Sequence, residues 1–263
     1  MMKKTAYFLL LLFLFSCAKV PVTGRRQINM LPESQLMSMS LTQYKAFLND
    51  SKPISRNNFN SKMVNDVGQK IARAAEAYLK QKHQNDRVKG FNWEFNLVDD
   101  PTVNAWCMPG GKVVFYTGIL PYTQDELGMA VVMGHEVAHA IARHGNERMS
   151  QGLVLQAGGI GLQLALQDKP ELTQNLLLQS YGIGGQLGML KYSRMHESEA
   201  DKMGLIFMAI TGYNPEAAPE FWKRMAQNGG QAPPEILSTH PHDETRIADI
   251  NSFMPEALKY YKP

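Results

Sequence analysis

The chain has 263 residues, 44% of them hydrophobic, and a formal net charge of +3, which is enough for one domain with a sizeable core. Without the two lysines of residues 1–16 the charge is +1, and this near-neutral balance argues against a nucleic-acid partner because no basic stripe remains. Cys17 and Cys107 are the two cysteines, so an intramolecular disulfide is possible only if both thiols stay unmodified.

Residues 1–16 have the composition of a targeting segment. Two lysines form a basic start, and the apolar stretch 7–15 would make a helix of about 14 Å. That is too short for a hydrocarbon core of roughly 30 Å. Residues 14–17 resemble a bacterial lipobox, although Phe15 is bulkier than the usual residue. The resemblance implies cleavage before Cys17 and lipidation of its thiol, which would hold the chain at a membrane. The alternative is an ordinary secretory signal with an incidental cysteine.

Cleavage would lower the net charge to +1, because the removed segment carries two lysines and no acid. Residues 17–33 are then expected to form a polar, lipid-anchored tether, and residues 34–263 a single domain. Apolar residues recur at helical spacing over 36–48 and 63–78, which predicts two helices at the start of this domain.

A small sheet is predicted next. Residues 91–97 alternate between apolar and polar side chains, which indicates a half-buried strand. Residues 103–108 and 112–116 flank the turn cluster 109–111 and predict two more short strands. An exposed edge could hold an extended peptide by main-chain hydrogen bonds, with 112–116 as the expected strand. The alternative is an ordinary edge strand.

An H-E-x-x-H motif follows the predicted sheet. His135 and His139 are four residues apart, so on a helix they lie on one face and can bind one metal ion. Glu136 lies beside them, where a general base would take a proton from a metal-activated water. The alternative is two core histidines and a surface glutamate that share this spacing by accident.

The helix that carries this motif has predictable boundaries. Thr123 and Glu126 have the spacing of a capping box, which predicts a start near Gln124. Gly145 is the expected terminator. The Gly-rich segment 149–190 then predicts a helical hairpin that divides at 168–170 and either covers the site as a lid or simply packs near it.

A third metal ligand is available further on, in a helix expected to end near Gly212. Glu197 can supply the carboxylate of a His₂Glu zinc site. Asp201, one turn later, can accept the other ring N–H of a liganding histidine. Glu199 points elsewhere and is the weaker candidate; the alternative for the whole group is a solvated acidic face.

Together these residues resemble the gluzincin zinc metallopeptidases, in particular the family of HtpX, the CAAX prenyl proteases and the BepA- and LoiP-like proteins. The further motifs that carry the resemblance are Gly24-Arg25-Arg26-Gln27, Asn104-Ala105-Trp106, Pro109-Gly110-Gly111, Thr117-Gly118, Ser193-Arg194, Glu199-Ala200-Asp201, and Thr239-His240-Pro241 with Arg246. The chain is most similar to the periplasmic lipoprotein members, since the multi-pass membrane helices of HtpX and the prenyl proteases are absent. The pair Trp106-Cys107 departs from the family pattern.

The resemblance implies a mainly α-helical α+β fold, in which a zincin-type metallopeptidase domain has a small sheet beside the H-E-x-x-H helix. It implies one Zn²⁺ per chain. His240 would stabilise the reacting oxyanion or plug the open metal position, and Arg246 would orient a substrate carbonyl or stabilise the tetrahedral intermediate. Alternatively, both only tie the C-terminal helix to the domain. The expected substrate contacts are Asn104, Ala105, Gly110, Gly111 and Val113.

The implied function is zinc-dependent hydrolysis of peptide bonds in unfolded or misassembled envelope proteins, with Glu136 as the catalytic base. The implied location is the bacterial envelope, with the chain anchored through Cys17 at the outer membrane and facing the periplasm. The alternative is a chaperone or assembly factor whose metal site is structural or latent.

Overall fold

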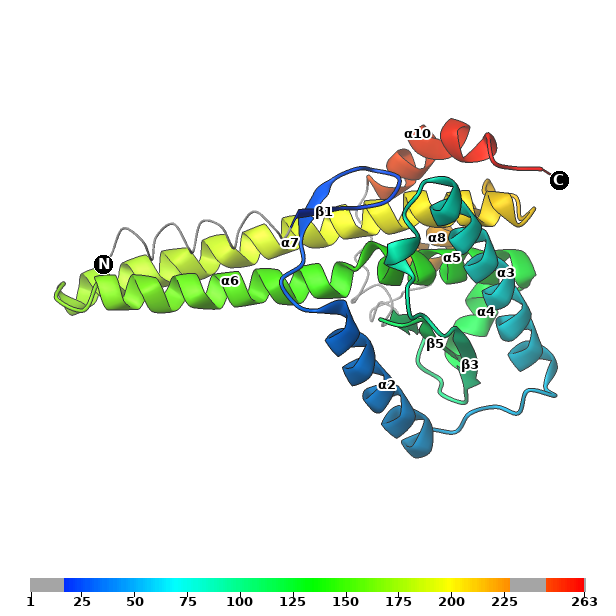
Figure 1. The fold of residues 1–263 in the computed structure, drawn as a ribbon, viewed down its shortest axis with the longest axis horizontal. Helices are drawn as coiled ribbons and strands as arrows, with labels where there is room; N and C mark the ends of the chain where they lie inside the picture. Colours follow the sequence, from blue (N-terminus) through cyan, green and yellow to red (C-terminus); the bar gives the residue numbers. More distant parts are fainter. Residues whose placement is uncertain (1–16, 228–244, 263) are drawn as a thin grey trace.

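The computed structural model describes residues 17–227 and 245–262. It shows a helical body with a three-stranded sheet and a β-hairpin, and a long helical arm on one side (Figure 1). The mainly helical α+β prediction is confirmed. Within the described ranges, no helix has the length and apolar character that a membrane crossing requires.

The chain begins with a β-hairpin packed on the body. β1 (Cys17–Lys19) pairs antiparallel with β2 (Arg26–Ile28). Val20 is 0% exposed and belongs to the main core, and Gln27 is buried as well. The prediction of a polar tether over 17–33 is therefore wrong, because these side chains find their partners only in the tertiary structure.

Two helices follow, as predicted. α2 (Glu33–Asp50) buries one narrow face, and α3 (Phe59–Gln81) buries a wide apolar stripe. The Asn58 side chain caps α3 by accepting hydrogen bonds from the N–H groups of Asn60 and Ser61, which satisfies two donors that the first turn leaves unpaired.

The sheet has three strands, β3 (Glu94–Val98), β4 (Ala105–Met108) and β5 (Lys112–Tyr116), in the order β3-β5-β4. β5 runs parallel to β3 and antiparallel to β4. The predicted hairpin is confirmed: Gly110 and Gly111 form its turn with φ of +88° and +81°, which favours glycine. β5 lies in the middle of the sheet, and β4 lies at an edge.

The short helix α4 (Leu120–Thr123) leads into the central helix α5 (Glu126–Ala142). Asp125 caps α5, since its carboxylate accepts the N–H of Gly128 at 2.8 Å. The predicted capping box is wrong, because Thr123 ends α4 and its hydroxyl donates to a carbonyl one turn back. Almost every α5 side chain is buried, so this helix runs through the core.

The end of α5 also differs from the prediction. Arg143 takes a left-handed conformation with φ of 59°, and α6 (His144–Ala165) begins directly after it. Gly145 thus lies inside α6 and does not terminate α5. After a turn that includes the predicted division at 168–170, α7 (Glu171–Ile210) runs for 40 residues. The second half of the Gly-rich segment and the helix that carries Glu197 are therefore one continuous helix. The sequence pattern predicted two separate helices.

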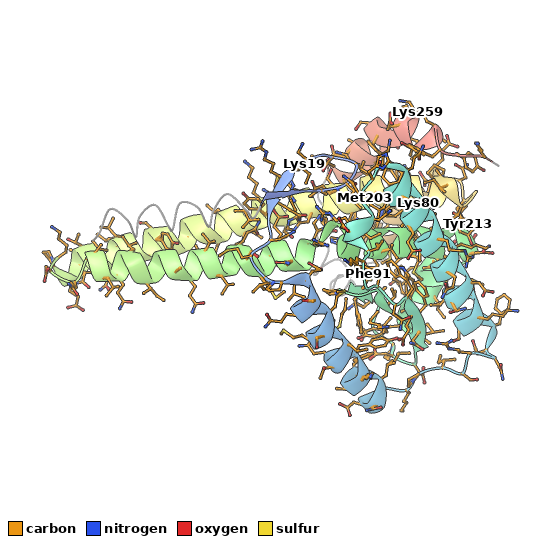
Figure 2. The ribbon with its side chains drawn as sticks, viewed as in Figure 1. Lys19, Lys80, Phe91, Met203, Tyr213 and Lys259 are labelled. Atoms are coloured by element: carbon orange, nitrogen blue, oxygen red, sulfur yellow. The ribbon has the colours of Figure 1, made fainter. Side chains whose placement is uncertain are left out.

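We call residues 149–190 of α6 and α7 the arm. The two helices run antiparallel away from the body (Figure 1), and side chains project from them along most of their length (Figure 2). The arm carries no charged residue over 149–167 or over 172–190. Many of its apolar side chains face outward: Leu164 is 63% exposed and Leu172 is 73% exposed.

Two C-terminal helices complete the body. α8 (Ala217–Gln227) packs against α5, and α10 (Arg246–Leu258) packs against both α7 and α8. Trp222 of α8 is among the largest buried side chains. α5 and α10 therefore cover the C-terminal half of α7, where its buried residues 196–209 lie.

Candidate metal centre

The crossing of α5 and α7 depends on two glycines. A Cβ on Gly204 would lie 2.9 Å from the backbone carbon of Gly134, and one on Gly134 would lie 3.0 Å from the carbonyl oxygen of Gly204. Without side chains at these positions the two backbones approach closely. Glu197, two turns before Gly204 in α7, is thereby brought against His135 and His139 of α5.

The three predicted ligands meet in space. The Nε2 atoms of His135 and His139 lie 3.0 Å apart. The Glu197 carboxylate lies between them, with Oε2 3.1 Å from Nε2 of His135 and Oε1 3.3 Å from Nε2 of His139. Two histidines and one carboxylate in such a cluster, largely buried, have the composition of a catalytic zinc site.

These distances fit zinc. Around a tetrahedral ion with ligand distances of about 2.0–2.1 Å, neighbouring ligand atoms lie roughly 3.3 Å apart. The observed separations of 3.0–3.3 Å are close to this value. Three protein ligands leave the fourth position for water or substrate, as a hydrolytic site requires.

Glu136 lies beside a cleft. It is 2% exposed and shares the lining of an open hollow of about 660 Å³ with His139. The other lining residues are Glu33, Trp106, Cys107, Pro109, Ala140, Arg143, His144, Gly145, Asn146 and Arg148. The buried base and a metal ligand therefore reach the surface through the same opening.

Cys107 is a half-buried free thiol that lines the same cleft as Glu136. Burial and the negative charge of Glu136 raise the pKa of the Cys107 thiol well above its ordinary value. The thiol therefore stays protonated at neutral pH. The departure at Trp106-Cys107 from the family pattern thus falls on the wall of the cleft.

A buried ion pair lies behind His135. Nδ1 of His135 is 2.8 Å from Oδ1 of Asp201, the contact predicted for Asp201. Arg246 donates to both Asp201 oxygens at 2.8 Å, and its guanidinium lies 3.4 Å above the ring centroid of Trp222. Burial opposes ionisation of Asp201, but Arg246 and His135 outweigh it and hold the pKa of the carboxyl below its usual value.

This arrangement favours the alternative raised from the sequence for Arg246. Its guanidinium contacts Asp201 and the Nδ1 edge of His135, opposite the Nε2 edge that faces the other ligands. Arg246 thus ties α10 to the centre, and its catalytic role stays a prediction. His240 lies outside the described residues, so its role stays a prediction.

A second buried cluster lies on the other side of the centre. Nδ1 of His144 is 2.9 Å from Nδ1 of His139, and Nε2 of His144 is 3.1 Å from the Glu199 carboxylate. Next to it, His196 lies 3.0 Å from Glu147. The sequence motifs point to neither histidine, and they rank Glu199 below Glu197 as a ligand.

One sequence signal could have revealed this cluster. His144 and Glu147 on α6, and His196 and Glu199 on α7, are both His-x-x-Glu pairs with three-residue spacing, so each pair shares a helix face. Arg25 bridges the two glutamates in the structure.

Nearby positive charge keeps the two glutamates of the second cluster ionised. Burial opposes ionisation of Glu147 and Glu199, but Arg25 and the neighbouring histidines outweigh it and lower both pKa values to about 2. Burial lowers the pKa of His144 to about 4 in spite of Glu199, so this imidazole is neutral at physiological pH.

The predicted substrate contacts separate into two groups. β5 pairs on both sides, so the prediction that Val113 and its strand present main-chain groups to a peptide is wrong. The carbonyls of Gly110 and Gly111 accept hydrogen bonds from the chain that enters β3, which gives these glycines a role in the turn. Asn104 and Ala105 lie at the start of the edge strand β4.

The fold and this centre define a class of protein. Two histidines of one helical H-E-x-x-H motif, a glutamate from a second helix and a glutamate base in a cleft are the parts of a gluzincin-type zinc metallopeptidase.

Comparison with known proteins gives the family. Residues 61–254 match peptidase family M48, and the chain belongs to that family. It is 37% identical over 180 residues to the mitochondrial metalloendopeptidase OMA1 of Arabidopsis thaliana, a match that covers 66% of this chain and 35% of the relative. It is 30% identical over 262 residues to the human metalloendopeptidase OMA1, which covers 95% of this chain and 48% of the relative.

A bacterial relative is also similar. The chain is 26% identical over 246 residues to the beta-barrel assembly-enhancing protease of Escherichia coli K12, which covers 91% of this chain and 48% of the relative. The chain therefore spans about half the length, or less, of these three relatives. The metal of the family is zinc, in agreement with the ligand set.

Proposed function

We propose that this chain is a zinc-dependent endopeptidase that hydrolyses unfolded or misassembled proteins of the cell envelope. The observation that carries the proposal is the buried set His135, His139 and Glu197 with Glu136 beside it in an open cleft. A purely structural metal site needs no general base and no opening.

The chemistry divides between the metal and the protein. Zinc, when bound, lowers the pKa of a water molecule and polarises the substrate carbonyl. Glu136 takes the proton from that water and delivers it to the leaving amine. Asp201 holds His135 in the tautomer whose Nε2 faces the metal.

The edge strand β4 is the proposed platform for the substrate main chain. The N–H of Tyr116 donates to the carbonyl of Asn104, so alternation along the ladder turns the main-chain N–H and C=O groups of Ala105 and Cys107 toward the outer edge. The Asn104 side chain accepts the N–H of Ala105 at 2.9 Å, which leaves the main-chain groups of Cys107 and the carbonyl of Ala105 for a peptide. No strand of the described chain pairs with that edge. An extended peptide could therefore add there through backbone hydrogen bonds, without a requirement for one particular sequence.

The envelope assignment has separate support. The E. coli relative carries the name of a beta-barrel assembly-enhancing protease, and residues 14–17 resemble a lipobox. We propose that the chain is exported, lipidated at Cys17 and held at the outer membrane, facing the periplasm. Since β1 begins at Cys17, such an anchor would hold the folded body directly against the lipid surface.

Replacing Glu136 by Gln tests the enzyme. The amide keeps the shape but cannot accept the proton, so hydrolysis of an unfolded casein should fall by about 10²–10⁴-fold. Metal analysis should still find one zinc per chain. The control is Glu33→Gln, in the same cleft but paired with Arg143, which should change the rate little. Wild-type hydrolysis by the Glu136→Gln variant would contradict the proposed mechanism.

The exposed apolar arm favours a second candidate, a chaperone or assembly factor with a structural or latent metal site, because unfolded chains bind such surfaces. The same pair of proteins separates the two. If wild type and Glu136→Gln both prevent aggregation of a denatured protein and neither hydrolyses it, the second candidate holds.

A further inference from the structure

The β1–β2 hairpin lies at the base of the arm, next to α7 (Figure 1). We call residues 17–31 the strap. The strap contacts α6 and α7 through ion pairs between Arg25 and two buried glutamates. The Arg25 guanidinium inserts between α6 and α7, where Nη1 and Nη2 donate to Glu147 at 2.7 and 2.6 Å. Nε and Nη2 donate to Glu199 at 2.8 and 2.9 Å. Thr23 adds a hydroxyl hydrogen bond of 2.7 Å to Glu199.

The carboxylates of Glu147 and Glu199 also contact two imidazoles. Glu199 binds His144 and Glu147 binds His196, and the two rings stack with centroids 4.3 Å apart. His144 then reaches the zinc ligand His139, Nδ1 to Nδ1, at 2.9 Å. A continuous chain of contacts therefore runs from the strap to the metal centre.

One set of tautomers satisfies this chain. When His139 turns Nε2 to the metal, its Nδ1 carries the hydrogen and must donate. His144 then accepts at Nδ1, so its own hydrogen is on Nε2, which faces the Glu199 acceptor. Glu199 thus selects the tautomer of His144, as Asp201 does directly for His135.

We propose that Arg25 is a positioning residue for the metal centre and that the strap is a working part of it. Arg25 fixes Glu199, Glu199 fixes His144, and His144 orients His139 toward the metal. Arg25 belongs to the motif Gly24-Arg25-Arg26-Gln27, which precedes the residues 61–254 that match the family. Without Arg25, two buried carboxylates face each other uncompensated, and Glu199 is free to turn away from His144.

Arg25→Gln tests the proposal, and Arg26→Gln is its matched control, since the neighbouring Arg26 side chain is exposed. Zinc affinity of the full chain is measured by competition with a chromogenic chelator at fixed pH. Loss of a group that orients a ligand lowers metal affinity by about 10–100-fold. We expect a loss in this range for Arg25→Gln, an intermediate loss for Arg25→Lys, which lacks the planar fork, and none for Arg26→Gln.

Thermal unfolding with and without zinc separates positioning from simple structural support. A structural role lowers the unfolding temperature of the zinc-free protein and leaves the gain on zinc addition unchanged. A positioning role shrinks that gain. If Arg25→Gln does not fold, Thr23→Val removes one hydrogen bond to Glu199 and should lower zinc affinity by a few-fold.

Three results have distinct meanings. Zinc binding by Arg25→Gln with wild-type affinity would overturn the positioning role, and so would an unchanged gain in unfolding temperature. Failure of the wild-type protein to bind zinc would instead contradict the metal assignment on which the proposal rests.

Discussion

At the scale of single residues, the centre depends on charges that are buried in compensating pairs. Asp201 and Arg246 are both largely buried and joined by two hydrogen bonds of 2.8 Å. Taking either charge out of water is costly unless the other accompanies it. Arg246 therefore contributes to the site through Asp201, and its loss should appear as instability before it appears in catalysis.

Arg246→Met should destabilise the zinc-free protein by about 3–5 kcal/mol, because it leaves the Asp201 carboxylate buried without its partner. Denaturant unfolding after chelation measures this free energy without a contribution from metal binding. Lys223→Met is the control, since the ion pair of Lys223 with Glu220 is exposed and should matter little. Equal unfolding midpoints for Arg246→Met and wild type would show that the pair is dispensable.

At the scale of elements, the distances between the three ligands depend on how α5 and α7 cross. α5 supplies both histidines in a fixed relation, because one helical turn separates them. The carboxylate of Glu197 comes from another helix, and its distance from the histidines depends on how closely the two backbones approach at Gly134 and Gly204.

Gly204→Ala should therefore disturb the centre without touching a ligand. The new methyl group meets backbone atoms of α5, and overpacking of this kind costs about 1–3 kcal/mol. Separation of the helices should also weaken zinc binding. Both effects are measured by denaturant unfolding and chelator competition.

The control is the same substitution at Gly161 of α6, where a Cβ meets nothing within 4 Å. It should stabilise the protein by about 0.5–1 kcal/mol, because alanine favours the helix. A neutral or stabilising Gly204→Ala variant would show that the crossing tolerates a side chain.

At the scale of the whole molecule, the body and the arm have different surfaces. The arm exposes leucine, isoleucine and valine side chains along two stretches without charge. Exposed apolar area of this kind is typical of a surface that contacts a partner or a membrane. The strap that starts at Cys17 lies at the base of the arm (Figure 1).

Under the anchoring proposed above, Cys17→Ser in a protein exported behind an ordinary secretory signal should move from membranes into the soluble fraction, because the serine cannot carry the thioether-linked lipid. Fractionation of cells followed by immunoblotting measures this. A variant that retains Cys17 but carries Leu164→Gln, Leu172→Gln and Leu176→Gln should stay with membranes. Retention of Cys17→Ser at the membrane, with release of the arm variant, would assign the attachment to the arm.

Features that depend on short spacing could be predicted from the order of the amino acids alone. The i, i+4 histidines, Glu136 between them, the Glu197 carboxylate with Asp201 one turn later, and the turn at Gly110–Gly111 could all be predicted. Each depends on helical periodicity or on a local backbone conformation, which neighbouring residues encode.

The remaining features depend on how the whole chain packs. This packing made β5 the central strand, turned Arg246 toward Asp201, joined the arm and the ligand helix into one α7, and brought Arg25 between Glu147 and Glu199. Arg25 and Glu199 are 174 positions apart in the chain. No local periodicity encodes such a pair, because the packing of the whole body decides which distant charges meet.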